Sequence, residues 1–124
     1  MITVGTDIIE VARINKALAR TGRFIDKVFT EKEINYCNNK AFPEQHYAGR
    51  FAAKEALKKA IMSMKPEIKT LPFKLFEINN EENGKPTVKI IQKEYSFLEN
   101  KYNLEISISH TSALATATAI MEKI

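Results

Sequence analysis

The chain has 124 residues, of which 44% are hydrophobic and 27% are charged, and its formal net charge is +4. This length and composition predict one globular domain over residues 1–124 and exclude the collagen-like and disordered classes. The single cysteine, Cys37, excludes an intrachain disulfide and suits a reducing compartment. Neither a signal peptide nor an apolar run of membrane-spanning length is visible, so we expect a cytoplasmic protein without a membrane segment.

The chain is predicted to open with a strand that leads into a helix. Apolar and polar residues alternate over residues 2–8, a pattern typical of a half-buried strand, and Asp7 falls on the same face as Gly5. Because glycine has no side chain, we expect open space beside the Asp7 carboxylate. Apolar residues at helical spacing follow, and Thr21-Gly22 is predicted to end that helix.

The central part of the chain predicts two further helices. Thr30 with Glu33 three residues later forms a capping-box pattern, so a helix is expected to begin near Glu31. A long helix is predicted from Pro43 to about Met64. Small residues that would allow close packing on a sheet share one side of it: Gly49, Ala53, Ala56 and Ala60. Larger and charged residues share the opposite arc, which we expect to be exposed: Phe51, Lys54, Glu55 and Lys58.

The remaining chain predicts mainly strands. Residues 73–78 and 87–91 read as a hairpin around a polar loop, and apolar residues recur at helical intervals over 91–102. Strand alternation returns from Leu104, and alternating alanines over 113–119 offer a flat face for the small stripe of the long helix. We therefore predict an α+β fold in which an antiparallel sheet packs against a long central helix.

Two carboxylates are candidates for binding Mg²⁺ together with a substrate phosphate. Mg²⁺ prefers oxygen ligands, and one or two carboxylates with phosphate oxygens and water are its usual set in proteins. Asp7 ends the first strand, and Glu55 stands among Lys54, Lys58 and Lys59. Each also has an ordinary structural interpretation, because Asp7 fits a helix N-cap and Glu55 fits routine helix ion pairs.

The two histidines and a basic run are the other candidate features. His110 shares the face of Ile106 and Ile108 at a strand end, where it fits either a core histidine or a group that binds phosphate or moves a proton. His46 is interpreted as a partly exposed helix-entry residue. A basic run with one acid is typical of a solvated helix face, a nucleic-acid-binding domain or a site for an acidic protein: Arg13, Lys16, Arg20, Arg23, Asp26 and Lys27.

Four segments, in this order, resemble the holo-acyl carrier protein synthases, which are small phosphopantetheinyl transferases. They are Gly5-Thr6-Asp7-Ile8 with Arg13-Ile14, the helix Gly49-Arg50-Phe51-Ala52-Ala53-Lys54-Glu55-Ala56-Leu57-Lys58-Lys59-Ala60, the loop Gly84-Lys85-Pro86, and Ile108-Ser109-His110-Thr111. The resemblance implies Mg²⁺-dependent transfer of phosphopantetheine from coenzyme A to a serine of apo acyl carrier protein, with release of adenosine 3',5'-bisphosphate, as in fatty acid biosynthesis.

The resemblance also implies roles for individual residues. Asp7 and Glu55 would bind Mg²⁺, with Glu55, Lys54 and His110 as catalytic residues. Coenzyme A would be bound by Arg50, Lys54, Lys58, Gly84, Lys85, Pro86, His110 and Thr111. Some relatives carry an aspartate where this chain has Asn35, and an amide cannot act as a base, so Glu55 or a water on the metal is the candidate base.

The resemblance implies two kinds of macromolecular partner. Acyl carrier proteins are acidic, so the basic run would dock one through charge complementarity and apolar contact, using Arg13, Arg20, Arg23, Phe24 and Phe51. A homotrimer with sites at subunit interfaces is implied as well. Two other functions stay open, a nucleic-acid-binding domain and a non-enzymatic adaptor. The first has only Phe24 as an aromatic residue among its basic ones, and the second leaves Asp7, Glu55 and His110 without a role.

Overall fold

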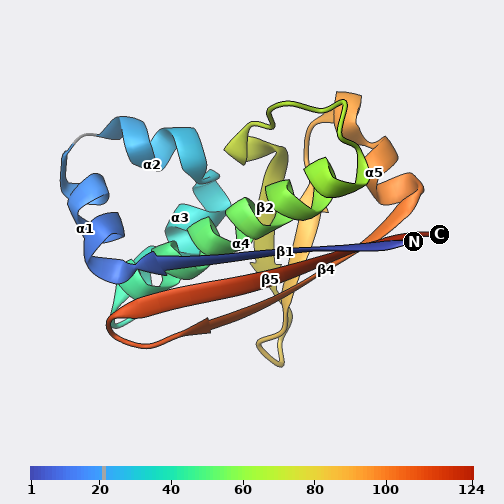
Figure 1. The fold of residues 1–124 in the computed structure, drawn as a ribbon. Helices are drawn as coiled ribbons and strands as arrows, with labels where there is room; N and C mark the ends of the chain where they lie inside the picture. The colour runs from blue at the N-terminus through green and yellow to red at the C-terminus, as the bar shows by residue number, and fades with distance from the viewer. Residues whose placement is uncertain (21) are drawn as a thin grey trace.

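The computed structural model describes residues 1–20 and 22–124, which form two antiparallel sheets and a set of helices (Figure 1). In chain order the elements are β1 (Ile2–Glu10), α1 (Val11–Arg20), α2 (Gly22–Val28), α3 (Glu31–Asn38), α4 (Pro43–Met64), the 3₁₀ turn η1 (Phe73–Leu75), β2 (Phe76–Asn80), β3 (Pro86–Ile90), the 3₁₀ turn η2 (Lys93–Tyr95), α5 (Phe97–Asn100), β4 (Tyr102–His110) and β5 (Leu114–Lys123). The predicted break at Thr21-Gly22 falls partly outside the described residues, since Thr21 is not among them, while Gly22 begins α2.

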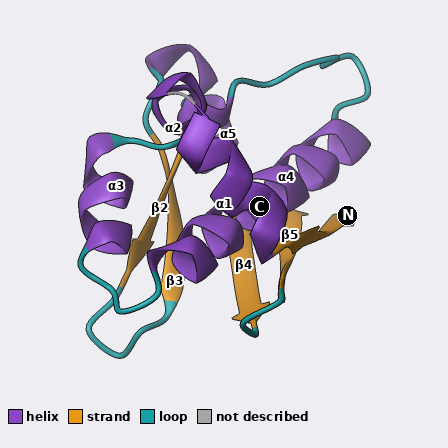
Figure 2. Ribbon diagram, turned by 90° about the vertical axis from the view of Figure 1, so that its left-hand side faces the viewer, coloured by secondary structure: helices purple, strands orange, loops and turns teal. Residues whose placement is uncertain are grey.

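Helix α4 lies along one face of a three-stranded sheet whose order is β1-β5-β4 (Figure 1). β2 and β3 form a separate antiparallel hairpin, which Figure 2 shows beside α3. The two chain ends lie side by side, and the Lys123 N–H donates to the Met1 carbonyl oxygen over 3.2 Å. This arrangement confirms the predicted α+β fold with an antiparallel sheet against a long central helix.

The close approach of α4 to the sheet depends on small residues on both surfaces. Ala53, Ala56 and Ala60 of α4 are fully buried against the inner face of the sheet, as the small stripe predicted. A Cβ atom on Gly5 would lie only 1.9 Å from the carbonyl oxygen of Ala56. Gly5 is therefore not the source of open space beside Asp7, because the backbone of α4 fills the volume that Gly5 leaves. Open space is nevertheless present there, since Asp7 lines a shallow pocket of about 320 Å³ together with Lys59 and Thr116.

A buried carboxylate joins α3 to α4 and to the hairpin. The predicted capping box is present, since the Thr30 hydroxyl accepts from the Glu33 N–H and the Glu33 carboxylate accepts from the Thr30 N–H. The same carboxylate accepts hydrogen bonds from the Lys54 ammonium at 2.7 Å and from the Ile78 N–H at 2.8 Å. One side chain thus satisfies donors from three elements, which fixes the position of α3 against the central helix.

Two predicted elements differ from the structure. The strand expected over 73–78 begins only at Phe76, because the Leu75 N–H donates to the Pro72 carbonyl oxygen and closes a 3₁₀ turn. The helical spacing over 91–102 yields only η2 and the single turn α5. There the Glu99 carboxylate accepts from the Ile90 N–H at the end of β3, which ties this segment to the hairpin.

The outer face of the three-stranded sheet is apolar and exposed. Ile2, Val4 and Ile8 of β1 have exposed fractions of 57%, 53% and 65%, and Ile120 of β5 pairs directly with Val4. The alternation in β1 therefore places its large apolar side chains outward, while Gly5 faces the helix. In Figure 1 the described helices lie above this sheet, and none of them covers its lower face.

Candidate active site

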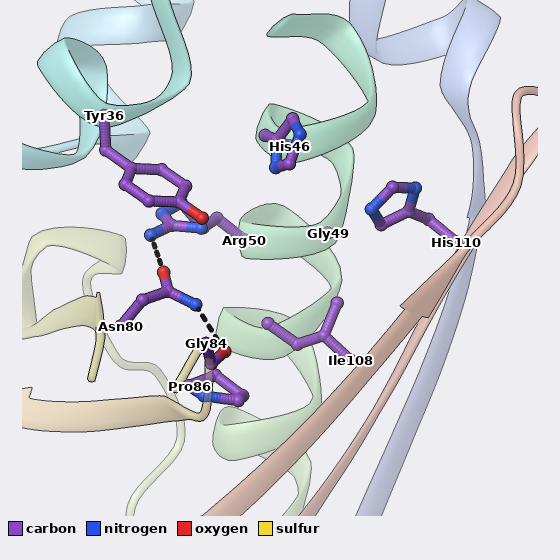
Figure 3. Close-up of a pocket in the computed structure, with 9 residues that line it drawn as sticks. All are labelled: Tyr36, His46, Gly49, Arg50, Asn80, Gly84, Pro86, Ile108 and His110. Atoms are coloured by element: carbon purple, nitrogen blue, oxygen red, sulfur yellow. Dashed lines mark hydrogen bonds between the residues drawn. The ribbon is translucent and has the colours of Figure 1, made fainter. Parts of the chain in front are cut away.

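A polar pocket of about 230 Å³ opens where α3, α4, β4 and the β2–β3 loop meet (Figure 3). Its walls come from elements far apart in the sequence: Tyr36, His46, Gly49, Arg50, Asn80, Gly84, Pro86, Ile108 and His110. Of the residues predicted to bind coenzyme A, the structure brings four together here: Arg50, Gly84, Pro86 and His110. The absence of a side chain at Gly49 keeps α4 close to β4, since a Cβ atom there would lie 3.0 Å from Ile108.

Arg50 is the central cation of this pocket. Its side chain is only 3% exposed, and its guanidinium stacks on the Tyr36 ring at 4.0 Å and donates to the Asn80 amide oxygen at 2.5 Å. The Arg50 Nε atom has no hydrogen-bond partner among the residues that the structure describes. A buried, unsatisfied guanidinium N–H that lines a pocket is a ready donor to a phosphate or carboxylate oxygen.

Two imidazole rings from different elements lie next to each other in Figure 3. The rings of His46 on α4 and His110 on β4 have centroids 5.3 Å apart, and His46 also packs edge-on against Tyr36. The strand parity predicted for His110 is confirmed, because it lies on the face of Ile108. Burial lowers the pKa of His46, and the nearby His110 and Lys40 lower it further.

The loop between β2 and β3 contributes its backbone more than its side chains. Gly84 has φ of +89°, a conformation that side chains rarely adopt, and its carbonyl oxygen accepts from the Asn80 amide at 3.0 Å. Lys85 points elsewhere and pairs with Glu105 at 3.7 Å, on an exposed surface. The Thr111 hydroxyl accepts from the N–H groups of Ala113 and Leu114, both at 3.1 Å, so in this structure it stabilises the β4–β5 turn.

Asp7 lies beside the turn of α4 that runs from Glu55 to Lys59. The Lys59 ammonium donates to the Thr6 carbonyl oxygen at 2.7 Å and lies 3.5 Å from the Asp7 carboxylate. Glu55 stands one helical turn before Lys59, on the same side of α4, and lies 3.7 Å from the Lys58 ammonium. Each of the two predicted metal-binding carboxylates thus faces a cation in this structure.

Oxygen atoms of this kind fit a magnesium ion that is shared with a substrate. Within the described residues no group of three or more His, Cys, Asp or Glu side chains is arranged to hold a metal. Two carboxylates that leave the remaining positions to phosphate and water are nevertheless a usual set for Mg²⁺. In this structure both carboxylates lie next to lysine ammonium groups, Glu55 beside Lys58 and Asp7 beside Lys59.

Lys54 does not project beside Glu55 as expected. Its side chain is fully buried, and its ammonium donates to the Glu33 carboxylate at 2.7 Å and to the Val28 carbonyl oxygen at 2.6 Å. The expected exposed position is wrong, because Lys54 faces α3 and the core rather than the solvent. Lys58 is different, since its ammonium lies 3.3 Å from the centroid of the Phe73 ring and burial lowers its pKa.

The residues predicted to dock a partner gather on α1, α2 and the adjoining face of α4. Arg13 and Arg20 of α1 and Arg23 of α2 are exposed. Phe24 and Phe51 are half-buried, with ring centroids 6.0 Å apart. They form a single small apolar surface next to the arginines, rather than two separate contact points.

Several site residues were missed by reasoning from the sequence. Lys59 faces Asp7, whereas from the sequence it was named only among the lysines around Glu55 and given no site role, although its position one turn after Glu55 was a signal for one. Tyr36 and Asn80 gave no such signal, because only the fold brings α3 and β2 to Arg50. His46 was interpreted as a helix-entry residue, yet it lines the pocket.

Comparisons with known proteins show the family to which the chain is similar. The family model described as "4'-phosphopantetheinyl transferase superfamily" matches residues 3–118. The holo-(acyl-carrier-protein) synthase of Clostridium beijerinckii is 45% identical over 125 residues, which cover 100% of this chain and 99% of that protein. The corresponding protein of Fusobacterium nucleatum is 40% identical over 124 residues, with 98% of each chain covered.

Solved structures of similar chains have the same fold. The Chronobacterium ammoniagenes ACPS–CoA complex has a TM-score of 0.85 at 26% identity and covers 100% of this chain and 98% of its own. The Helicobacter pylori holo-(acyl-carrier-protein) synthase, in complex with coenzyme A, has a TM-score of 0.80 at 30% identity, with 96% and 99% covered. Among the described residues, no helix is both long and apolar enough to cross a bilayer. The chain belongs to the 4'-phosphopantetheinyl transferase superfamily and, within it, to the holo-(acyl-carrier-protein) synthases.

Proposed function

We propose that the protein transfers the phosphopantetheine group of coenzyme A to a serine of an apo acyl carrier protein, in a Mg²⁺-dependent reaction. The serine oxygen attacks the phosphorus atom that bears pantetheine, so a new P–O bond forms. The P–O bond to the nucleotide breaks, and adenosine 3',5'-bisphosphate leaves with the electron pair. The serine proton passes to a base, so atoms and charge balance.

The spacing of two groups on α4 supports this function. Arg50 lies in the cationic pocket, and Glu55 lies five residues later on the same helix. At a rise of about 1.5 Å and a turn of about 100° per residue, the two positions are about 7.5 Å apart along the helix axis and face different sides of α4. A site that uses both sides would be completed between two copies of the chain in the proposed homotrimer, where coenzyme A offers phosphate at two places, its diphosphate and its separate phosphomonoester.

Asp7 and Glu55 are the residues that would hold the metal ion beside the diphosphate. When bound, Mg²⁺ would neutralise charge on the reacting phosphoryl group. Lys59 and Lys58 stand next to these carboxylates and would contact the remaining phosphate oxygens. In this proposal Lys54 does not touch the substrate. It acts as a positioning residue, because its buried contact with Glu33 holds the helix that carries Glu55.

Glu55 is the residue that we assign as the proton acceptor. Its side chain is partly exposed and lies next to the proposed metal position, where an incoming serine would arrive. Asn35 on α3 is exposed and carries an amide, which has no basic group to offer. His110 lies in the nucleotide pocket, so we assign it to phosphate or nucleotide binding, with Gly84 and Pro86 next to the nucleotide.

The partner surfaces of the proposal are the basic helices and the outer sheet face. An acidic carrier protein would be oriented by Arg13, Arg20 and Arg23 and would contact the apolar surface of Phe24 and Phe51. The exposed apolar residues of β1 and β5 would be covered by further copies of the chain in a homotrimer. The free, buried thiol of Cys37 accords with a cytoplasmic location.

One assay tests the proposed activity. Purified protein is incubated with coenzyme A, Mg²⁺ and an apo acyl carrier protein, and the carrier is weighed by mass spectrometry. We expect the carrier to gain the mass of one phosphopantetheine group, and we expect no gain when a chelator removes Mg²⁺. An unchanged carrier mass in the complete mixture, with protein shown to be folded, would contradict the proposal.

A further inference from the structure

His46 lines the proposed nucleotide pocket, and its polar ring nitrogens are available to a ligand there. It precedes Arg50 by one helical turn, so both side chains leave α4 toward the same space, as Figure 3 shows. Its ring contacts the rings of His110 and Tyr36, at centroid distances of 5.3 and 5.9 Å. Yet its ring nitrogens form no hydrogen bond with any residue that the structure describes.

Most of the polar groups that face His46 are basic side chains. His110 comes from β4, Lys40 from the turn after α3, and Arg50 from the next turn of α4, while Glu44 is the one acidic neighbour that affects it. Burial and these three neighbours lower the pKa of His46, and Glu44 opposes them. The imidazole is therefore held neutral at neutral pH, next to a guanidinium whose Nε–H is unsatisfied.

Three nitrogen-bearing side chains that converge with Glu44 as the one acidic neighbour named for His46 favour a ligand with two negative charges. A phosphomonoester is such a ligand, because its second pKa is about 6 and it is mostly a dianion above neutral pH. Its charge would offset the repulsion between Arg50 and a protonated His46. A protonated His46 would then offer two N–H donors and a positive charge to the phosphate, whereas the neutral ring offers only one donor.

We propose that His46 is a phosphate-binding residue of this pocket, and that its imidazole takes up a proton when the phosphomonoester of the nucleotide binds. The inference rests on the proposed function, because that function supplies a nucleotide with a phosphomonoester. His46 recognises this phosphate together with Arg50 and His110, and distinguishes it from a free ribose hydroxyl.

This proposal fixes the sign of the pH dependence. If the pKa of His46 is higher in the complex than in the free protein, the complex binds more protons. Affinity then rises as the pH falls through the window between the two values. Adenosine 3',5'-bisphosphate should therefore bind more tightly at pH 6.5 than at pH 8.5. Adenosine, which carries no phosphate, should show no such change.

The chain contains only two histidines, which makes the direct measurement simple. Imidazole C–H signals are followed by NMR across pH, with and without adenosine 3',5'-bisphosphate, and a His46→Gln protein assigns them. We expect the pKa of His46 to rise on binding. His46→Phe tests whether the ring alone is sufficient, because it keeps a ring against Tyr36 and His110 but cannot ionise or form a hydrogen bond.

Both variants should bind adenosine 3',5'-bisphosphate about tenfold more weakly than the wild type at pH 6.5, and the difference should shrink toward pH 8.5. An unchanged pKa of His46 in the complex, or variants that bind as tightly as the wild type at pH 6.5, would overturn the role of His46. If phosphopantetheine transfer persists in that case, the proposed function stands. If the wild type neither binds the bisphosphate nor modifies the carrier, both proposals fail.

Discussion

Lys54 shows how a residue in the most recognisable segment of the sequence can serve the fold. The long helix motif suggested an exposed phosphate ligand, but the ammonium is fully buried and bonded to Glu33 and Val28. Burial lowers the pKa of Lys54, while the Glu33 carboxylate opposes this and favours the charged form. Lys54 and Glu33 therefore each compensate the buried charge of the other.

Replacing Lys54 by methionine should destabilise the protein strongly. The Lys54→Met protein keeps a side chain of similar length but leaves the Glu33 carboxylate without its cation, so we expect a loss of about 3–5 kcal/mol in the free energy of unfolding. Urea denaturation measures this loss. Lys58→Met is the matched control one turn later and should lose less, because Lys58 is partly exposed. Equal stability in the two variants would contradict the assigned role of Lys54.

At the residue scale, the sequence predicted the local partners but not the distant ones. The capping box could be predicted because Thr30 and Glu33 are three residues apart and their geometry is set by one helix. The contacts of Glu33 with Lys54 and Ile78 span 21 and 45 residues, so they exist only once the fold has formed. The same holds for the stacking of Arg50 on Tyr36.

At the scale of elements, the contact between β1 and α4 determines where Asp7 lies relative to Glu55. Besides the small residues at the interface, the Thr3 hydroxyl donates to the Ala60 carbonyl oxygen at 2.7 Å. Any group added at Gly5 would meet helix backbone rather than a mobile side chain. The separation of the Asp7 and Glu55 carboxylates thus depends on Gly5, which has no side chain and no direct role in the reaction.

A Gly5→Ala substitution should therefore be costly. The new Cβ would overlap the Ala56 carbonyl oxygen, so β1 and α4 must separate, and we expect a loss of about 3 kcal/mol or more in unfolding free energy. Thermal and urea unfolding provide the measurement. Gly22→Ala is the control, because a Cβ atom added there would meet nothing within 4 Å and alanine favours a helix. A Gly5→Ala protein as stable as the control would show that the contact is not tight.

Element prediction succeeded where one local signal dominated. The bounds of α4 followed from Pro43 at its start and from an uninterrupted helix-forming composition. The prediction of a helix over 91–102 was wrong for most of the segment, because its apolar residues lie in two short turns and at the start of β4. In β1 the alternation was real, but the face that turned inward was the one with Gly5, since α4 needed the small residue.

At the scale of the whole molecule, the outer sheet face is the largest feature that the single chain leaves unexplained. Val4 and Ile120 are direct cross-strand partners, with exposed fractions of 53% and 41%. Charges placed there should prevent burial against another copy. We therefore expect the wild type to be a trimer and a Val4→Glu/Ile120→Lys protein to be a monomer, by light scattering after gel filtration.

The control for the trimer test is Ile91→Lys, which changes an apolar residue of the same 41% exposure outside this sheet. It should remain trimeric. A wild-type protein that is monomeric at micromolar concentration would contradict the proposed assembly. So would a doubly charged variant that still forms trimers.

The basic surface on α1 predicts a dependence of carrier binding on salt. Reversing Arg13 and Arg20 to glutamate should weaken binding of an acidic carrier protein about tenfold or more, most strongly at low ionic strength. The affinity for coenzyme A should change little, because neither arginine lines the nucleotide pocket. Calorimetric titrations at two salt concentrations separate these effects. Carrier binding that does not respond to salt would contradict the role of this surface.

The central claim is that Asp7 and Glu55 hold one divalent ion together with coenzyme A, and binding of Mn²⁺, followed by its electron paramagnetic resonance signal, tests it most directly. In the presence of coenzyme A, Asp7→Asn and Glu55→Gln should each weaken Mn²⁺ binding at least about tenfold. The double variant should bind Mn²⁺ only slightly more weakly than either single variant, because both substitutions act on the same binding site and their effects do not add. Wild-type Mn²⁺ affinity in either single variant would contradict the claim.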